Sequence, residues 1–239
     1  MPSKGRVAVF GASGALGQSL TKWFVRSGWN VVAFSRSKEF GNNIDQDVQC
    51  FSYDPEESEA SPGFWQKVGL LNSVVWAQGV NFNDNIYSFD ADAHEKMYRA
   101  NVLYVVKTLN SLLQEKLLVA PARLCLVSSI WQNLARQNKM SYSMTKAALQ
   151  GFILSAALDL GKEGHLINAV LPGALDTPMT HANLTPEQVQ RFAGATYFNR
   201  LPTMDDVCNT VEFLCLSSNT GVTGQFIAVD LGFSHARII

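Results

Sequence analysis

The sequence predicts an α/β protein built on a doubly wound, seven-stranded parallel sheet with helices on both faces. Short apolar runs alternate along the chain with segments of helical periodicity, as in strands joined by crossover helices. A glycine-rich turn separates the first apolar run from the first helical segment, which is typical of the unit that begins such a sheet. The 239 residues contain no internal repeat, linker or low-complexity tract, so 1–239 is expected to be one domain.

Seven apolar runs are expected to be strands, and five segments of helical periodicity are expected to be helices. The strands are 6–10, 30–34, 48–53, 73–77, 123–128, 167–171 and 226–230. The helices are 15–27, 62–69, 92–117, 142–161 and 203–217. The last helix is expected to be capped by Thr203, with Asp206 three positions later.

The first turn, residues 11–17, has glycines spaced for contact with a phosphate group. A strand precedes the turn and a helix follows it, which is the context that makes the spacing meaningful. Gly11 permits the tight turn, and Gly17 permits the helix to pack on the strand. Gly14 or Ala15 permits pyrophosphate to approach backbone N–H groups. The predicted cofactor contacts are Gly11, Ser13, Gly14, Ala15, Leu16 and Gly17. The alternative is a helix that simply begins at a glycine-rich turn.

A tyrosine and a lysine four positions apart indicate proton chemistry. Tyr142 and Lys146 lie one turn apart on one face of the helix expected over 142–161. A nearby ammonium favours the phenolate, so we expect Lys146 to lower the pKa of Tyr142. Ser129 ends a predicted strand, where ligands bind in open parallel sheets, and can donate to the oxygen that Tyr142 protonates. The alternative is a chance spacing of a solvated lysine and a half-buried tyrosine.

Together these features resemble the single-domain branch of the short-chain dehydrogenase/reductase family, which has the Rossmann fold. The resemblance covers essentially the whole chain. In the family's Gly-x-x-x-Gly-x-Gly turn, Ala15 replaces the middle glycine and Gly14 lies one position earlier. The resulting spacing is more usual in the family's larger sugar-nucleotide branch. The family's Asn-Asn-Ala-Gly segment is represented by residues 76–79, Trp-Ala-Gln-Gly, which keep only the last glycine.

The resemblance implies further site residues. Asn101 matches the family's fourth catalytic residue, which holds a water in the proton relay. Residues 168–173 and 176–178 resemble the segment that lies against the nicotinamide, and the region of about 174–200 matches the substrate lid. The implied catalytic residues are Asn101, Ser129, Tyr142 and Lys146. The further implied cofactor contacts are Ala77, Gly79, Tyr142, Lys146, Pro172, Gly173, Leu175 and Thr177.

Residues after the second predicted strand favour NADP(H) over NAD(H). Ser35 occupies the position of the acid that binds the ribose hydroxyls of NAD in the family. Arg36, with Lys38 as a second contact, can bind the 2′-phosphate of NADP. Asp54 matches the family's adenine-side aspartate, and it is equally well explained as a turn residue before Pro55.

Composition narrows the partners and the location. A net charge of −1 without a Lys/Arg cluster argues against nucleic acid or an anionic membrane as a partner. The sequence shows neither a signal peptide nor a long apolar span, so a cytoplasmic protein is expected. The four cysteines are expected to be small core residues, and the four histidines lack metal-ligand spacing, so no metal site is predicted: Cys50, Cys125, Cys208, Cys215, His94, His165, His181 and His235.

A homo-oligomer, a dimer or a tetramer, is expected. Charged residues make up only 16% of the chain, which suggests surface buried between subunits. The helix expected over 142–161 is apolar on more than the one stripe that a single core needs. Its second face is predicted to meet a partner helix across a two-fold axis.

The favoured function is a reversible carbonyl reductase/alcohol dehydrogenase that uses NADP(H) and a small-molecule substrate. Tyr142 would protonate the forming alkoxide, Lys146 would hold the nicotinamide ribose, and Ser129 would orient the carbonyl. One alternative, suggested by the glycine spacing, is a sugar-nucleotide epimerase or dehydratase. Another is a dinucleotide-sensing protein without catalysis.

The substrate class stays open between two sets of side chains in the predicted pocket loops. The polar set suits a sugar-like or acidic molecule, and the aromatic set suits an apolar ring. The polar set is Asn81, Asn83, Gln132, Asn133, Arg136, Gln137 and Asn138, and the aromatic set is Trp131, Tyr197 and Phe198. The alternative is that half or more of the polar residues are solvated loop positions.

Overall fold

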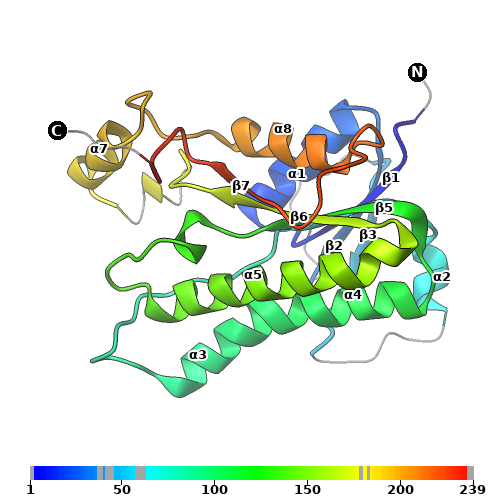
Figure 1. The fold of residues 1–239 in the computed structure, drawn as a ribbon, viewed down its shortest axis with the longest axis horizontal. Helices are drawn as coiled ribbons and strands as arrows, with labels where there is room; N and C mark the ends of the chain where they lie inside the picture. The colour runs from blue at the N-terminus through cyan, green and yellow to red at the C-terminus, as the bar shows by residue number, and fades with distance from the viewer. Residues whose placement is uncertain are drawn as a thin grey trace.

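A computed structural model describes residues 3–36, 40, 46–56, 63–177, 180–181 and 184–235. Seven parallel strands form one sheet in the order β3-β2-β1-β4-β5-β6-β7, which confirms the predicted fold class (Figure 1). The strands are β1 (Arg6–Phe10), β2 (Asn30–Ser35), β3 (Gln49–Ser52), β4 (Leu71–Trp76), β5 (Leu118–Val127), β6 (Leu166–Pro172) and β7 (Phe226–Val229). The order reverses between β1 and β4, and such a switch point opens a crevice at the carboxyl ends of the strands.

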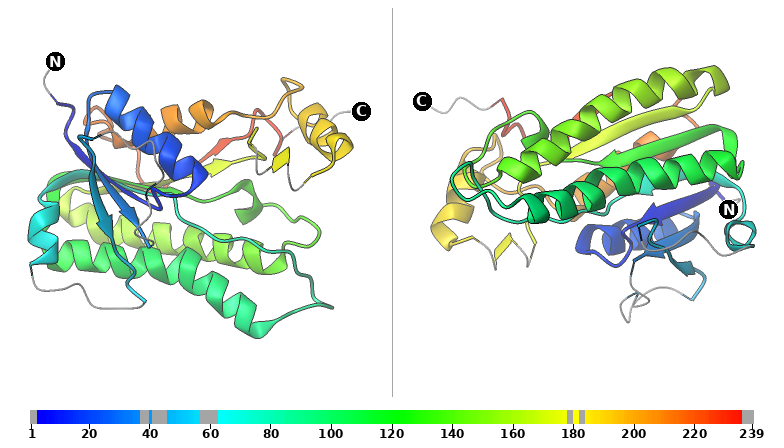
Figure 2. Two further views of the ribbon diagram at one scale, coloured as in Figure 1. Left: turned by 180° about the vertical axis from the view of Figure 1, so that it is seen from behind. Right: turned by 90° about the horizontal axis from the view of Figure 1, so that it is seen from below.

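Helices cover both faces of the sheet. Figures 1 and 2 show α3, α4 and α5 on one face and α1 and α8 on the other. The bounds are α1 (Ala15–Arg26), α2 (Phe64–Val68), α3 (Ala91–Tyr98), α4 (Tyr104–Gln114), α5 (Met140–Leu160), α7 (Pro186–Gly194) and α8 (Met204–Cys215). The predicted cap of α8 is confirmed, because Thr203 and Asp206 form a reciprocal capping box.

The structure differs from the predicted elements in two places. The helix expected over 92–117 is interrupted by a π-helical segment, Arg99–Leu103, between α3 and α4, and the helical run ends at Gln114. Helix α7, which we did not predict, lies inside the expected lid and begins at a capping box of Thr185 and Gln188. The start signal of α7 was nevertheless present in the sequence, since Thr185 is followed by Pro186 and, three positions after the cap, by Gln188.

The core lies in two layers, one on each face of the sheet. Under α4 and α5, Phe34, Phe10 and Trp76 stack across β2, β1 and β4, with ring centres 4.4 Å and 5.8 Å apart. On the other face, Leu20 and Phe24 of α1 pack against the sheet. Side chains of a strand alternate between faces, so apolar residues at consecutive positions fill both layers.

Three of the cysteines are buried as predicted, and the prediction for the fourth was wrong. Cys125, Cys208 and Cys215 are buried, whereas Cys50 is exposed because it lies on β3, the edge strand of the sheet. Within the described part of the chain, no helix is both long and apolar enough to cross a membrane.

Candidate active site

The structure brings the predicted tyrosine, lysine and serine together at the carboxyl end of β5. Tyr142 and Lys146 lie in the first turns of α5, and the Lys146 Nζ is 5.6 Å from the centre of the Tyr142 ring. The Ser129 hydroxyl forms a hydrogen bond with the Tyr142 side chain. The neighbouring Ser128 instead donates to Gln132 Oε1 at 2.8 Å. The paired serines therefore have different roles, and Ser129 is the one that belongs to the site.

Lys146 is a buried cation held by a backbone carbonyl. Its side chain is 4% exposed, and its Nζ donates to the Val127 carbonyl oxygen at 3.1 Å. Burial lowers the pKa of Lys146 to about 8, because the low-dielectric surroundings disfavour the charged form. At neutral pH the amine is therefore mostly protonated and close to its titration range.

The expected downward shift of the Tyr142 pKa is not what the structure gives. Burial raises the pKa of the Tyr142 phenol, and the hydrogen bond from Ser129 offsets only part of this rise. The four-residue spacing correctly predicts that Tyr142 and Lys146 lie close together. It does not reveal how deeply they are buried, and burial decides the direction of the pKa shift of Tyr142. In this form of the protein the phenol keeps its proton, which suits a proton donor to a substrate oxygen.

Asn101 lies in the π-helical segment between α3 and α4, where it joins two other parts of the site. Its Oδ1 accepts from Val80 N at 2.8 Å, and its Nδ2 donates to the Val80 carbonyl at 3.0 Å and to Thr145 Oγ1 at 3.0 Å. A π-turn widens a helix locally and is common at functional sites. Asn101 thereby fixes the loop after β4 beside α5, and its expected water-holding role stays a prediction.

The loop after β4 leaves space beside the catalytic groups. A Cβ on Gly79 would lie 3.4 Å from Asn101 Oδ1 and 3.8 Å from Lys146 Nζ. Ala77 donates its backbone N–H to the Phe10 carbonyl at 2.9 Å, which holds this loop against the glycine turn. The Gln78 Oε1 is buried and has no hydrogen-bond partner among the described residues. A polar ligand in the crevice would supply such a partner.

The glycine turn has the close backbone packing that the sequence predicts. Gly11 has φ +81°, and a Cβ there would be 2.5 Å from Gln78 N. A Cβ on Gly17 would be 2.1 Å from the Gly11 carbonyl oxygen, so only glycine fits between α1 and the turn. Helix α1 begins at Ala15, with Leu16 in its first turn and Gly14 as an N-cap without a side chain. The turn therefore presents the positive end of a helix to the crevice, as a phosphate-binding turn does.

The end of β2 carries the residues predicted to select the cofactor. Ser35 is 1% exposed, and its hydroxyl donates to Ser13 Oγ at 2.8 Å, which joins it to the glycine turn. Arg36 follows as an exposed residue, and its carbonyl accepts from Ser52 Oγ at 3.3 Å. Asp54 Oδ1 accepts from Glu56 N at 2.9 Å, which supports its interpretation as a turn residue. Lys38 lies outside the described residues.

The segment after β6 forms the opposite wall of the crevice. Pro172 ends β6, and Gly173 donates its N–H to the Val229 carbonyl at 3.0 Å. A Cβ on Gly173 would be only 3.0 Å from that of Asp230. Leu175 packs on the α1 side of the sheet, and the buried Thr177 accepts from Thr180 N at 3.1 Å. Pro178 lies outside the described residues.

Helix α7, which lies in the region expected to be the lid, is docked on the loop that carries Ser129. Trp131, Phe192 of α7 and Phe233 form an aromatic cluster, with ring centres 5.7–6.5 Å apart. The Arg136 guanidinium lies over two of these rings, 5.6 Å from the centre of Trp131 and 5.1 Å from that of Phe192. In Figure 1, α7 lies at the end of the molecule where α5 begins. The expected lid region therefore borders the catalytic residues.

A network at the start of α5 was missed by sequence reasoning. The buried Asp84 accepts from Ser141 N at 3.0 Å and from Ser141 Oγ at 2.5 Å, although 57 residues separate the two. His94 Nδ1 is 2.8 Å from the same Ser141 hydroxyl. The Asp84 carboxylate thus caps the helix that carries Tyr142. No local pattern could indicate this pairing, because capping side chains are expected within three residues of a helix start.

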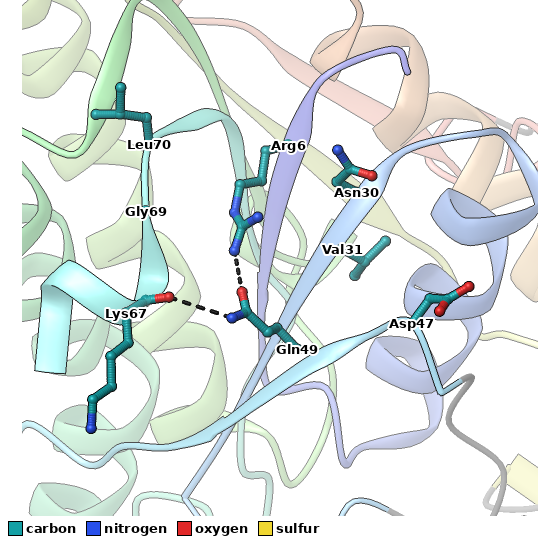
Figure 3. A pocket seen from close by; sticks show the side chains of 8 residues that line it. All are labelled: Arg6, Asn30, Val31, Asp47, Gln49, Lys67, Gly69 and Leu70. Atoms are coloured by element: carbon teal, nitrogen blue, oxygen red, sulfur yellow. Dashed lines mark hydrogen bonds between the residues drawn. The ribbon is translucent and has the colours of Figure 1, made fainter. Parts of the chain in front are cut away.

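A pocket of about 450 Å³ lies at the other end of the sheet and does not belong to this site (Figure 3). It is lined by the first residues of three strands, Arg6, Asn30 and Gln49. Arg6 donates to Gln49 there, and Gln49 donates to the Lys67 carbonyl at 3.5 Å. Because the strands are parallel, this edge of the sheet is opposite the edge that carries Ser129, Tyr142 and Lys146.

The fold and the site define an α/β protein built to bind a dinucleotide at the switch point of its sheet. A glycine turn, a buried lysine beside a tyrosine, and Gly79 next to that lysine meet at one sheet edge. A family model described as "Enoyl-(Acyl carrier protein) reductase" matches residues 11–234. The chain belongs to the short-chain dehydrogenase/reductase family.

Characterised relatives resemble the chain over nearly its full length. L-rhamnose 1-dehydrogenase (NADP(+)) of Thermoplasma acidophilum is 25% identical, with 96% of each chain covered. L-xylulose reductase of Bos taurus is 26% identical, covering 95% of this chain and 96% of the relative. The crystal structure of a gluconate 5-dehydrogenase from Burkholderia cenocepacia, in complex with NADP and tartrate, has a TM-score of 0.86. It is 20% identical and covers 97% of this chain and 96% of its own, so it shows the shared fold.

Replacing the buried lysine should separate stability from function. We expect Lys146→Met to raise the free energy of unfolding at pH 7, because it removes a cation whose pKa is lowered from 10.5 to about 8 by burial. A gain on the order of 2–3 kcal/mol is expected, from about 3.5 kcal/mol for the pKa difference at about 1.4 kcal/mol per pKa unit, less about 1 kcal/mol for the lost hydrogen bond to Val127. Urea unfolding measures it.

The pH dependence of this difference is fixed by the sign of the shift. Below pH 8 both the folded and the unfolded wild type carry the charge, so the penalty is complete, and it disappears between about 8 and 10.5 as the folded protein loses the proton first. The advantage of Lys146→Met should therefore shrink toward pH 10. The exposed Lys162→Met is the matched control. A Lys146→Met protein less stable than wild type at pH 7 would contradict the account.

Proposed function

We propose that this protein is an NADP(H)-dependent oxidoreductase that interconverts a carbonyl and an alcohol on a small molecule. The observation that carries the proposal is the meeting of Ser129, Tyr142, Lys146 and Asn101 at the sheet edge that also holds the glycine turn. A dinucleotide-sensing protein would not need a hydrogen-bonded tyrosine beside a costly buried cation. Family membership gives the oxidoreductase chemistry its wider support.

The cofactor fits the residues that line the crevice. The glycine turn and the start of α1 would hold the pyrophosphate, since Gly11 and Gly17 allow no side chain there. Lys146, next to the gap at Gly79, would hold the nicotinamide ribose. When bound, the cofactor supplies or accepts the hydride.

The protein's own residues handle the substrate oxygen and its proton. Ser129 and Tyr142 share a hydrogen bond now, and both can turn their hydroxyls to one carbonyl oxygen. Tyr142 holds the proton that the forming alkoxide takes, and the Lys146 ammonium stabilises the phenolate that results. Burial of the Lys146 ammonium excludes water around it, which strengthens its interaction with the phenolate.

The residues at the end of β2 support NADP(H) over NAD(H) as the cofactor. A carboxylate at position 35 would bind both ribose hydroxyls of NAD, but Ser35 is committed to Ser13 of the glycine turn. Arg36 is exposed at the mouth of the crevice and can form bidentate bonds with a 2′-phosphate. The Thermoplasma acidophilum relative is named for its use of NADP(+).

We also propose that the protein is a homo-oligomer, a dimer or a tetramer. Helix α5 carries an exposed apolar stripe with heptad-like spacing, made of Met144, Ala147, Gly151, Leu154 and Leu158. Leu154 is 53% exposed and Leu158 is 79% exposed, and a Cβ on Gly151 would meet no atom within 4 Å. Small residues at the centre of such a stripe allow a second helix to approach closely.

The first prediction concerns the proton donor. Tyr142→Phe should reduce turnover by about 100-fold or more, as loss of a general acid typically does, while NADPH binding stays nearly unchanged. Steady-state rates and a fluorescence titration of NADPH measure the two effects. Tyr87→Phe is the matched control, because Tyr87 is 97% exposed. A Tyr142→Phe protein with more than about a tenth of the wild-type rate would disprove the assignment.

The second prediction concerns cofactor choice. We expect the wild type to prefer NADPH over NADH by about ten- to a hundredfold, the effect of one good charged hydrogen-bond pair. Arg36→Ala should remove most of this preference by weakening NADPH binding, with little change for NADH. Parallel titrations of both cofactors measure it, with the exposed Arg26→Ala as control. Equal affinities in the wild type would mean that Arg36 only faces solvent.

The third prediction concerns assembly. Light scattering at micromolar concentration should give a dimer or tetramer mass for the wild type. Leu154→Glu combined with Leu158→Glu should give a smaller species, because charges on the stripe oppose burial. Leu70→Glu changes a 60% exposed leucine at the far end of the sheet and should leave the mass unchanged. A monomeric wild type would refute the oligomer.

A further inference from the structure

A second pocket, of about 430 Å³, lies beside the start of α5 and next to the catalytic tyrosine. Its lining includes Met140 and Ser143, which flank Tyr142 along the helix. Ile86 and Ala135 give it apolar walls, and Arg136 contributes a cation. The pocket therefore has room for the carbon skeleton of a small molecule, and its wall at Ser143 is one residue from Tyr142 along α5.

Lys139 is the second cation of this pocket and lies in line with the catalytic pair. Lys139, Tyr142 and Lys146 follow one another at spacings of three and four residues, so they form one stripe on α5 and its N-cap. Lys139 is only 8% exposed. Its Nζ donates to the neutral Asn81 Oδ1 at 2.8 Å, which leaves two ammonium hydrogens for a ligand.

Arg136 also lines the pocket, and its N–H donors can bind a ligand there. Its guanidinium contacts Trp131 and Phe192 through their ring faces, at 5.6 Å and 5.1 Å from the ring centres. Contacts to a ring face use the flat side of the guanidinium, so its edge can still form two parallel bonds to a carboxylate. Within the described part of the chain, no carboxylate lies within ion-pair distance of Arg136 or Lys139.

Burial leaves these two cations in an unfavourable state without a ligand. It lowers the pKa of Arg136, and burial together with the nearby Arg136 charge lowers the pKa of Lys139. Asp84 also lines the pocket and opposes this shift only in part. Its two oxygens accept from the Ser141 N–H and hydroxyl, so the carboxylate is already used to cap α5.

We propose that the substrate of this enzyme carries a carboxylate, which Arg136 and Lys139 bind while the carbonyl or alcohol lies at Ser129 and Tyr142. The proposal rests on the proposed oxidoreductase function and names its substrate class. A planar carboxylate matches one bidentate guanidinium and one ammonium. A neutral polyol of the same size would bring no negative charge to Arg136 and Lys139 and would bind more weakly. Because Arg136 also packs on Phe192 of α7, the acid would be held next to the lid.

The test compares acids with neutral molecules of the same length. The pairs are gluconate with glucitol and 3-hydroxybutyrate with 3-hydroxybutyramide, and glycerol 3-phosphate serves as a phosphate ester. Each is titrated by calorimetry into the protein saturated with NADP⁺, and turnover is followed separately by cofactor absorbance. We expect at least one acid to bind about tenfold or more tightly than its neutral partner and tighter than the phosphate ester.

Variants assign the effect to the two cations. Arg136→Gln should reduce the affinity for the acid by about ten- to a hundredfold, and Arg136→Lys, which keeps the charge without the bidentate edge, should lose less. Lys139→Met should also weaken the acid. Arg191→Gln removes an exposed charge from α7 and should leave the affinity unchanged. An unchanged NADP⁺ affinity shows that each variant is folded.

The binding measurement tests the carboxylate assignment, and the turnover measurement separately tests the proposed reaction. Equal binding of the acid and neutral members of both pairs, an acid preference unaffected by Arg136→Gln, or a preference for the phosphate ester would overturn the carboxylate assignment. Turnover of neutral alcohols would leave the oxidoreductase function standing in that case. Acid binding that depends on Arg136, without turnover of any substrate, would support the pocket and count against the proposed reaction.

Discussion

The burial of the Lys146 ammonium is the constraint on which the rest of the site depends. A cation with 4% exposure and a pKa lowered to about 8 is tolerated only where the surrounding structure holds it. The carboxyl end of β5 supplies the Val127 carbonyl, and Gly79 leaves the space beside it. Asn101 holds the Gly79 loop in place through both backbone groups of Val80. The π-helical segment that carries Asn101 is thus tied to the same requirement.

The first turns of α5 connect this constraint to the substrate side. Asp84 caps the helix through Ser141, and Lys139, one turn before Tyr142, meets Asn81 of the same loop. Further out, Arg136 packs on Trp131 and on Phe192 of the lid. Lys146, Tyr142, Lys139 and Arg136 therefore lie in order along one helix and its preceding loop. A small displacement of the α5 N-terminus would disturb the positions of all four side chains.

Local patterns in the sequence were sufficient for the sheet and for the proximity of Tyr142 and Lys146. Alternating apolar runs gave every strand, and the four-residue spacing placed Tyr142 next to Lys146. The π-turn at Asn101 was not predictable, because one extra residue in a long amphipathic helix hardly changes its period. The direction of the Tyr142 pKa shift was also beyond the sequence, since it depends on burial by distant segments. Likewise, the Asp84–Ser141 pair spans 57 residues.

The central claim is that Tyr142 and the buried Lys146 serve a hydride transfer between NADPH and a carbonyl. The most direct measurement uses NADPH deuterated at C4, in two separate stereochemical forms, with a panel of keto acids under single-turnover conditions. Mass spectrometry of the product alcohols should find one deuterium at the former carbonyl carbon from one labelled form and none from the other. Tight NADPH binding without label transfer to any member of the panel would contradict the claim, and would indicate a protein that binds the dinucleotide without using its hydride.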